Sequence, residues 1–249
     1  MARKFSLLLV LLALLAGGCA GVVPGFVSGG GKLRVLVLKG ADEVAIKGAM
    51  GGDVELRRSP AGIVTSNGEV VSLPRRFYPR GRSIELDGKP YRGVLEVAAD
   101  EKGLLVVDEI GIERYLVGII NNEISSRWPV EAIKAQAVAA RTYAAYQKRK
   151  RAGEFYHIEG SVLGQVYNGT SAEDSAARGA VRQTRGEILV YGGEPALAVY
   201  HSNAGGRTEA AGEVWGKAYP YLKSVESPYD RGDPRYVWEF TIPADTLAG

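Results

Sequence analysis

The chain has few of the residues that usually build cofactor sites, metal centres and disulfide scaffolds. Its 249 residues include one cysteine, Cys19, and two histidines. A single cysteine excludes an intramolecular disulfide, and two isolated histidines fall short of a tetrahedral zinc set. The glycines before Lys32 form no phosphate loop, because Phe26 and Leu33 stand where such a loop has glycine and Ser or Thr. We therefore expect no metal and no cofactor.

An excess of charge of one sign is also missing. The formal net charge is +3. Arg3 and Lys4 lie in a segment that we expect to be removed, and without them the net charge is about +1, which is too small to indicate nucleic acid as a partner. The remaining composition, with 46% apolar and 24% charged residues, is that of an ordinary globular protein.

The N-terminus has the pattern of a targeting segment. The apolar run over residues 5–16 follows Arg3 and Lys4 and is too short for a membrane span. It has the length of a signal-peptide core, so residues 1–18 are predicted to be a signal peptide. Residues 16–19 resemble a bacterial lipobox, with Ala16 where leucine is more usual. The alternative is an ordinary secretory signal with an incidental cysteine.

We predict that Cys19 is lipidated and that residues 19–31, which are rich in glycine, form a flexible tether. The protein is then exported to the cell envelope and anchored to a membrane by its lipid. The absence of aspartate after Cys19 favours the outer membrane where the cell has one. Peptidoglycan is abundant in this compartment, whereas ATP and nicotinamide cofactors are scarce.

The mature chain is predicted to be α+β, a mixed β-rich core with one long alanine-rich helix and a small N-terminal β module. Residues 32–92 read as short strands and form this module, with hairpin signals at Asn67-Gly68 and Asp87-Gly88. Residues 93–249 form the core. It is expected to contain a short helix around 113–116, helices over 129–151 and 173–184, and strands over 187–191, 195–201 and 237–242.

The long helix begins with favourable residues. Pro129 suits the first helical position, Glu131 lies in the first turn, and alanine dominates the rest of the segment. Lys134 and Arg141 are seven residues apart and so project from nearly the same face. Glu123 precedes them in what reads as a short loop. These groups are either a carboxyl beside a cationic face or ordinary solvated charges.

A resemblance favours the first interpretation. The segment over residues 123–144, Glu-Ile-Ser-Ser-Arg-Trp-Pro-Val-Glu-Ala-Ile-Lys-Ala-Gln-Ala-Val-Ala-Ala-Arg-Thr-Tyr-Ala, resembles the signature of the SpoIID/LytB family. The likeness continues in residues 165–169, 200–209, 214–216 and 219–222, and covers roughly residues 93–230. The family includes sporulation glycan hydrolases and amidase enhancers. Its members often continue further, so the core is expected to be cut short at Gly249.

The resemblance implies a peptidoglycan lytic transglycosylase that cleaves MurNAc–GlcNAc bonds, with Glu123 as the single general acid and base. A general acid must keep its proton near neutral pH, which requires desolvation of its carboxyl. The sugar is expected to be held by further side chains and by a glycine turn that lets backbone approach it. These substrate-binding residues are Lys134, Arg141, Gln165, Tyr167, His201, Ser202, Gly205, Gly206, Thr208 and Glu209.

Other readings of these residues stay open. Each of them also has an ordinary structural reading, and Trp128 either stacks on a sugar or belongs to the core. A catalytic pairing of Ser202 with His201 is disfavoured, because neighbouring residues on a strand point to opposite faces. The whole protein is alternatively a non-catalytic glycan-binding amidase enhancer. Its expected partners are peptidoglycan glycan strands and an N-acetylmuramoyl-L-alanine amidase.

Overall fold

The computed structural model describes residues 23–26, 31–233, 236–237 and 239–243. The predicted signal peptide and Cys19 lie outside these residues. The described chain forms two compact units, one from Val22 to Ala198 and one from Val199 onward. Helices and strands are mixed along the chain without a repeating order, which confirms the α+β class.

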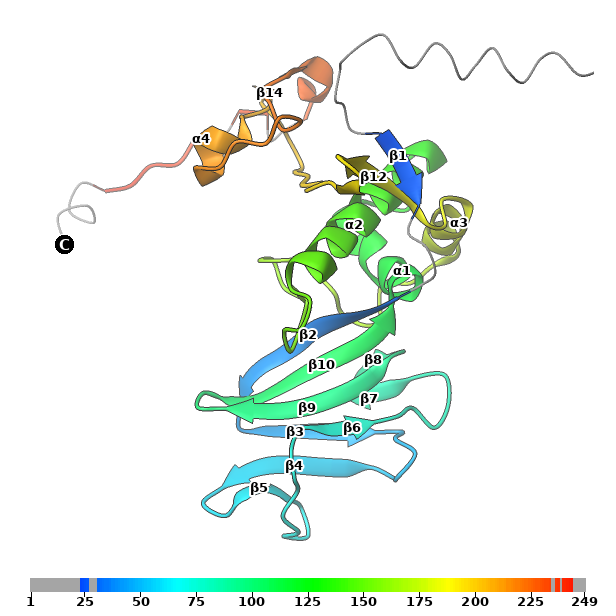
Figure 1. Ribbon diagram of the computed structural model, residues 1–249, viewed down its shortest axis with the longest axis vertical. Coiled ribbons are helices and arrows are strands. Elements are labelled where there is room, and N and C mark those ends of the chain that lie inside the picture. The colour runs from blue at the N-terminus through cyan, green and yellow to red at the C-terminus, as the bar shows by residue number, and fades with distance from the viewer. Residues whose placement is uncertain (1–22, 27–30, 234–235, 238, 244–249) are drawn as a thin grey trace, which may run out of the picture. The chain divides into compact units, whose positions relative to one another are not determined.

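The larger unit is built on an antiparallel sheet of long strands, completed by one short parallel strand (Figure 1). Its strand order is β11-β2-β10-β9-β6. Alternate positions of the central strand β10 are apolar and buried, including Leu104 and Val106. These strands are β2 (Lys32–Ala41), β6 (Arg75–Phe77), β9 (Val94–Asp100), β10 (Gly103–Gly111) and β11 (Ile158–Glu159).

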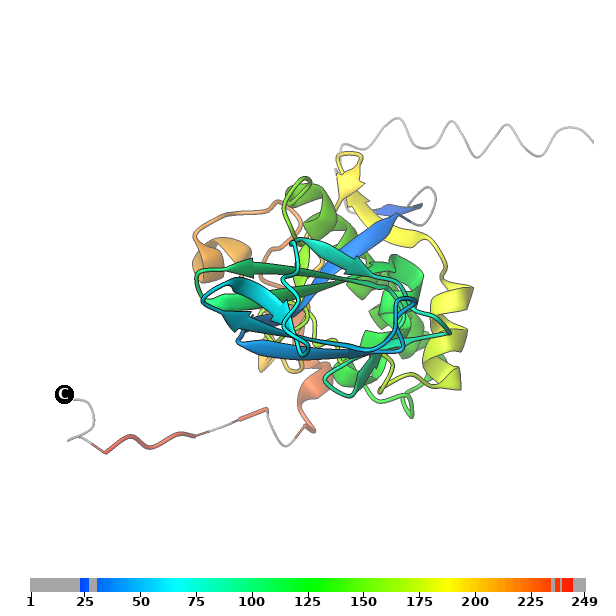
Figure 2. The same cartoon turned by 90° about the horizontal axis from the view of Figure 1, so that it is seen from below.

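A second five-stranded sheet has the order β5-β4-β3-β7-β8. The predicted turn at Asp87-Gly88 is confirmed: it joins β7 to β8, and both of its residues have positive φ, as a tight hairpin requires. Seen from below, the two sheets form two facing layers (Figure 2). The strands are β3 (Glu43–Lys47), β4 (Val54–Ser59), β5 (Gly62–Thr65), β7 (Ile84–Leu86) and β8 (Lys89–Tyr91).

The predicted boundary between residues 92 and 93 falls inside this β structure. Strand β2 pairs with β10, and β6 pairs with β9, so residues from both sides of the boundary share one sheet. The structure therefore does not separate residues 32–92 as a module of their own. The break between compact units comes later, after Ala198.

Three helices cover one end of the sheets: α1 (Ile112–Glu123), α2 (Val130–Lys150) and α3 (Ser175–Gln183) (Figure 1). The long helix is confirmed, but Pro129 is its N-cap with extended backbone rather than its first helical residue. The helix before it is longer than predicted, because α1 runs twelve residues and includes Glu123. In the described part of the chain, no helix is both long and apolar enough to cross a membrane.

A small sheet packs beside the helices and has the order β1-β12-β13. It comprises β1 (Val23–Phe26), β12 (Glu187–Tyr191) and β13 (Glu194–Pro195), the last two joined by the predicted glycine hairpin. Part of the predicted tether is thus a strand, because β1 pairs with β12 over its whole length.

The second unit contains little regular structure. Its elements are β14 (Gly206–Arg207), α4 (Ala211–Trp215), β15 (Glu226–Ser227) and the 3-10 turn η1 (Pro228–Asp230). The predicted strand over 195–201 ends at Pro195. The strand predicted over 237–242 is not formed in its described residues.

Candidate active site

Glu123 is the last residue of helix α1. The helix forms because Ile112, Leu116, Ile119 and Ile120 recur at helical spacing and are buried. It ends where Ile124 takes extended backbone, with its amide still donating to the Ile120 carbonyl at 2.9 Å. The carboxyl therefore sits on a packed helix rather than in the short loop that the sequence pattern predicts.

Residues 121–127 line an open hollow of about 410 Å³ at this helix end. Glu123 is the one carboxyl among its seven lining residues, and Arg127 is the one cation. Trp128, which comes directly after them, is 57% exposed and is not a core residue. The hollow thus offers an acid at the end of a packed helix and a cation from the turn beyond it, and an exposed aromatic residue follows directly in the sequence.

Arg141 lies in the interior and does not face this hollow. Its side chain is fully buried and makes a bidentate ion pair with Glu113, with both N–O distances 2.9 Å. It also donates to the carbonyls of Val181 and Glu187, from two further elements. The expectation that Arg141 binds sugar is therefore corrected: it joins α1 to α2 and α3. Lys134 remains near the surface and pairs with Glu131 at 2.7 Å.

Gln165 and Tyr167 are buried as well. The Gln165 amide nitrogen donates to the Ala140 carbonyl and its oxygen accepts from Tyr115, whereas the Tyr167 hydroxyl donates to Asp108 at 2.8 Å. Gln165 is 1% exposed and Tyr167 is 3% exposed. This burial contradicts their predicted contact with a saccharide. Both side chains instead fix the loop over residues 165–169 against the sheet and helices.

Asp108 is fully buried on strand β10. Burial raises the pKa of its carboxyl to about 7, although the bonds from Tyr167 and the Gly93 backbone act in the opposite direction. Burial likewise raises the pKa of Tyr167, and the carboxyl beside it adds to the effect. The pair forms a polar link within an otherwise apolar and aromatic cluster, in which Tyr167 meets Tyr91 and Tyr115 edge-on.

The remaining predicted residues lie in the second unit. His201, Ser202, Gly205 and Glu209 are exposed, and the two glycines at 205 and 206 have positive φ. Thr208 is half-buried, and its hydroxyl accepts from the Val225 amide at 3.0 Å. A glycine turn with an exposed histidine is therefore present. This turn and Glu123 belong to different compact units, and their joint contact with one sugar stays a prediction.

The other histidine is structural. His157 is buried, and its Nδ1 accepts from the Arg34 amide at 3.1 Å. Burial lowers its pKa, and the charges of Lys148 and Arg34 lower it further. Among the described residues, no group of three or more histidines, cysteines or acids is placed to hold a metal.

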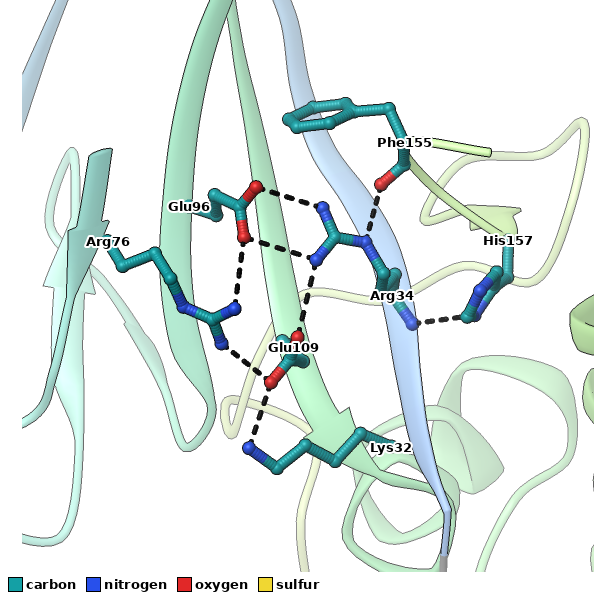
Figure 3. Close-up of polar contacts among 7 residues, drawn as sticks. All are labelled: Lys32, Arg34, Arg76, Glu96, Glu109, Phe155 and His157. Atoms are coloured by element: carbon teal, nitrogen blue, oxygen red, sulfur yellow. Dashed lines mark hydrogen bonds and ion pairs between the residues drawn. The ribbon is translucent and has the colours of Figure 1, made fainter. Parts of the chain in front are cut away.

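A network of charged side chains crosses the face of the sheet that contains β2, β10, β9 and β6 (Figure 3). Arg34 bonds both oxygens of Glu96, and Glu109 accepts from Lys32 and Arg76 at 2.8 and 2.7 Å. Burial alone would raise the pKa of Glu109, but these two bonds lower it to about 2. The pairs come from neighbouring strands, so the network fixes the sheet that supports α1.

Comparison with known proteins relates part of this sequence to a known family. Residues 100–191 match the family model described as SpoIID, stage II sporulation protein. The chain carries a SpoIID-family domain. The domain spans β10, the helices α1, α2 and α3, and β12, so it includes Glu123 and the hollow.

Three relatives match the chain over part of their length. An uncharacterized protein of Brachyspira hyodysenteriae is 41% identical over 141 residues, 56% of this chain and 38% of its own. The Bacillus subtilis amidase enhancer is 33% identical over 186 residues, 74% of this chain and 25% of its own. Stage II sporulation protein D of the same species is 35% identical over 145 residues, which is 52% of this chain and 42% of its own length. The matches span less than half of each relative.

Several important residues of the SpoIID domain are not singled out by the sequence pattern. Asp108 is one, and its signal was an acid inside an apolar strand, between Val107 and Ile110. Glu113, the partner of Arg141, gave no comparable signal. Nor did the side-chain amides of Asn121 and Asn122, which hold the end of α1.

Proposed function

We propose that the protein is a peptidoglycan lytic transglycosylase that cleaves MurNAc–GlcNAc bonds, with Glu123 as general acid and base. The observation that carries the proposal is the position of Glu123 as the one carboxyl lining the hollow, at the end of a packed helix. The SpoIID match and the names of the relatives support a role at the cell wall.

The reaction needs one carboxyl used twice. The protonated Glu123 carboxyl donates its proton to the glycosidic oxygen as the bond between that oxygen and the MurNAc anomeric carbon breaks. The resulting carboxylate then takes the proton of the MurNAc C6 hydroxyl, whose oxygen bonds to the anomeric carbon. The products are a GlcNAc with a free hydroxyl and a 1,6-anhydro end. No water is consumed, and Glu123 regains its proton. Hydrolases usually need a second carboxyl, which the hollow's lining lacks.

Substrate contacts come from groups near the surface. Arg127 lines the hollow, and the exposed Trp128 offers a face on which a sugar ring stacks. Lys134 and the turn that carries His201 are the further predicted contacts. We propose that strands already stripped of their peptides by an amidase are preferred.

A non-catalytic role is the second candidate. The amidase enhancer of B. subtilis is 33% identical over 74% of this chain, and its name favours a protein that stimulates an amidase. In that case the hollow holds glycan, Glu123 accepts hydrogen bonds from sugar hydroxyls, and an N-acetylmuramoyl-L-alanine amidase is the partner.

One experiment separates the candidates. The full chain in detergent is incubated with denuded glycan, and new anhydro ends are measured by mass spectrometry. Cleavage that is lost in Glu123→Gln, with glycan binding kept, supports the enzyme. Glu101→Gln is the control, because Glu101 is an exposed acid in the turn between β9 and β10 and does not line the hollow. Binding without new ends, together with stimulation of an amidase, supports the enhancer.

We propose further that the protein is an exported lipoprotein anchored through Cys19. The support is the sequence pattern of residues 1–19. In Cys19→Ser the protein is expected to move from the membrane fraction to the soluble envelope fraction. Retention of that variant in the membrane would count against the anchor.

A further inference from the structure

The last turn of α1 has none of the usual helix-ending features. The four final carbonyls of a helix lack intrahelical partners, and glycine at the end or a nearby cation commonly satisfies them. Here the residue after Glu123 is Ile124 in extended conformation, and the last turn carries no basic residue. A helix end of this kind frays unless contacts from outside the helix hold it.

Two neighbouring asparagines provide such contacts. Asn121 Nδ2 donates to the Ala172 carbonyl at 2.8 Å. Asn122 Nδ2 donates to the Val166 carbonyl at 2.9 Å and to the Gly118 carbonyl of its own helix at 3.2 Å. Asn121 and Asn122 are therefore tied to two points, six residues apart, on the single connection between β11 and α3.

This connection is itself fixed near both points. Next to Val166, Tyr167 is anchored on Asp108 of the sheet, and α1 meets the connection so closely at Gly118 that an added Cβ would lie 2.6 Å from the Gly169 carbonyl. Two residues after Ala172, Asp174 caps α3 by accepting from the Ala177 amide at 2.8 Å.

Asp174 also lies near residues that line the hollow. The pKa of its carboxyl is lowered by the bond from Ala177 first, and the polar side chains of Ser126 and Asn121 lower it further. Ser126 and Asn121 both line the hollow. The carboxylate that caps α3 is thus near polar side chains from the end of α1 and from the turn beyond Glu123.

We propose that Asn121 and Asn122 are positioning residues that fix the Glu123 carboxyl, with Asp174 and the loop over residues 165–169 as their supports; we call this group of residues the clamp. The inference rests on the proposed role of Glu123. A general acid acts only within hydrogen-bond reach of the oxygen it protonates, and small displacements at a reacting centre cost large factors in rate. Neither asparagine needs to touch the glycan.

The test compares Asn121→Ala and Asn122→Ala with wild-type in the full chain in detergent. We expect kcat on denuded glycan to fall about 10- to 100-fold and KM to change by less than about threefold, because positioning acts on the transition state rather than on binding. Hydrogen exchange of the Ile124 amide, which bonds the Ile120 carbonyl, should become faster. The control is Gln183→Ala, an exposed amide at the end of α3.

A third variant keeps the test decisive if an alanine variant does not fold. Asn is as good a helix cap as Asp, so Asp174→Asn retains the cap of α3 while removing a carboxylate oxygen from the clamp. Asp174→Asn should also lower kcat, by a smaller factor than the two alanine variants do.

Two results would overturn the proposal. One is an active wild-type whose asparagine variants keep their kcat; the other is a rise in KM with kcat unchanged, which would make the amides ligand contacts. If wild-type makes no anhydro ends, the transglycosylase proposal fails by itself. The exchange measurement then decides the clamp alone: unchanged exchange at Ile124 in both variants refutes it.

Discussion

The buried ion pair between Arg141 and Glu113 gives the sharpest test of how the helices are held. Arg141→Met keeps much of the length and apolar stem of the side chain and removes the guanidinium. Glu113 then loses both of its 2.9 Å bonds, and the Val181 and Glu187 carbonyls lose a donor. We expect a clear loss of stability with the glycan site left in place.

The expected magnitude depends on the exposure of the two partners. Removing one partner of a fully buried pair costs about 3–5 kcal/mol. The Glu113 side chain is 26% exposed and keeps a bond from the Gly186 amide at 3.2 Å, so part of its desolvation cost is relieved. We therefore expect a loss of about 2–4 kcal/mol in the free energy of unfolding, which lowers Tm by roughly 5–12 °C for a chain of this size.

The assay is chemical and thermal unfolding followed by circular dichroism, with glycan binding measured on the same samples. Arg149→Met is the matched control on the same helix, because its pair with Glu194 is largely exposed and should contribute less than about 1 kcal/mol. A double-mutant cycle with Glu113→Gln should show coupling of about 0.5–3 kcal/mol.

The opposite pattern would refute the structural role of Arg141. If Arg141→Met left Tm unchanged and abolished glycan binding, Arg141 would be a ligand contact rather than a structural residue. Equal destabilisation by Arg149→Met would show that burial of the cation does not set the cost of removing it.

Three further predictions concern other positions of the larger unit. The pKa of Asp108 is about 7 when folded and 3.8 as an ordinary carboxyl, so the folded state binds this proton more tightly. The free energy of unfolding should fall by up to about 4 kcal/mol as pH rises from 4 to 8, and Asp108→Asn should remove this slope. Glu109, with its pKa lowered to about 2, contributes stability above pH 4.5 that is lost as pH falls toward 2, so acid unfolding curves of wild-type and Glu109→Gln should converge there. Gly118→Ala should cost about 1–3 kcal/mol by overpacking against Tyr167, whereas Gly179→Ala, with open space around it, should stabilise α3 by up to about 1 kcal/mol; equal Tm changes in the two would contradict the close packing of α1.

Local chemistry made part of the fold predictable. The turn at Asp87-Gly88 needs two positive φ angles, and residues that tolerate them stand there. The long helix and α3 could be predicted from alanine content and the spacing of apolar residues, and the structure adds the Asp174 cap of α3. The role of Glu123 was predicted from the family resemblance, and the structure adds that this residue ends helix α1.

The burial of Arg141 could not be predicted in the same way. Helix α2 is so rich in alanine that no strong apolar stripe marks its inner face. Its inward side is decided by partners far away in sequence, such as Glu113, 28 residues earlier. Tyr167 and Asp108 are 59 residues apart, and neither position alone predicts that the two meet.

The pairing of β1 with β12 limits how far the larger unit can move from its proposed anchor. Val23 already belongs to the folded unit, and Cys19 precedes it by four positions. A fully stretched chain covers roughly 14 Å over that distance. With a lipid on Cys19, the larger unit would work close against the bilayer. It would reach only the wall layer nearest to that membrane, and glycan would have to come to it.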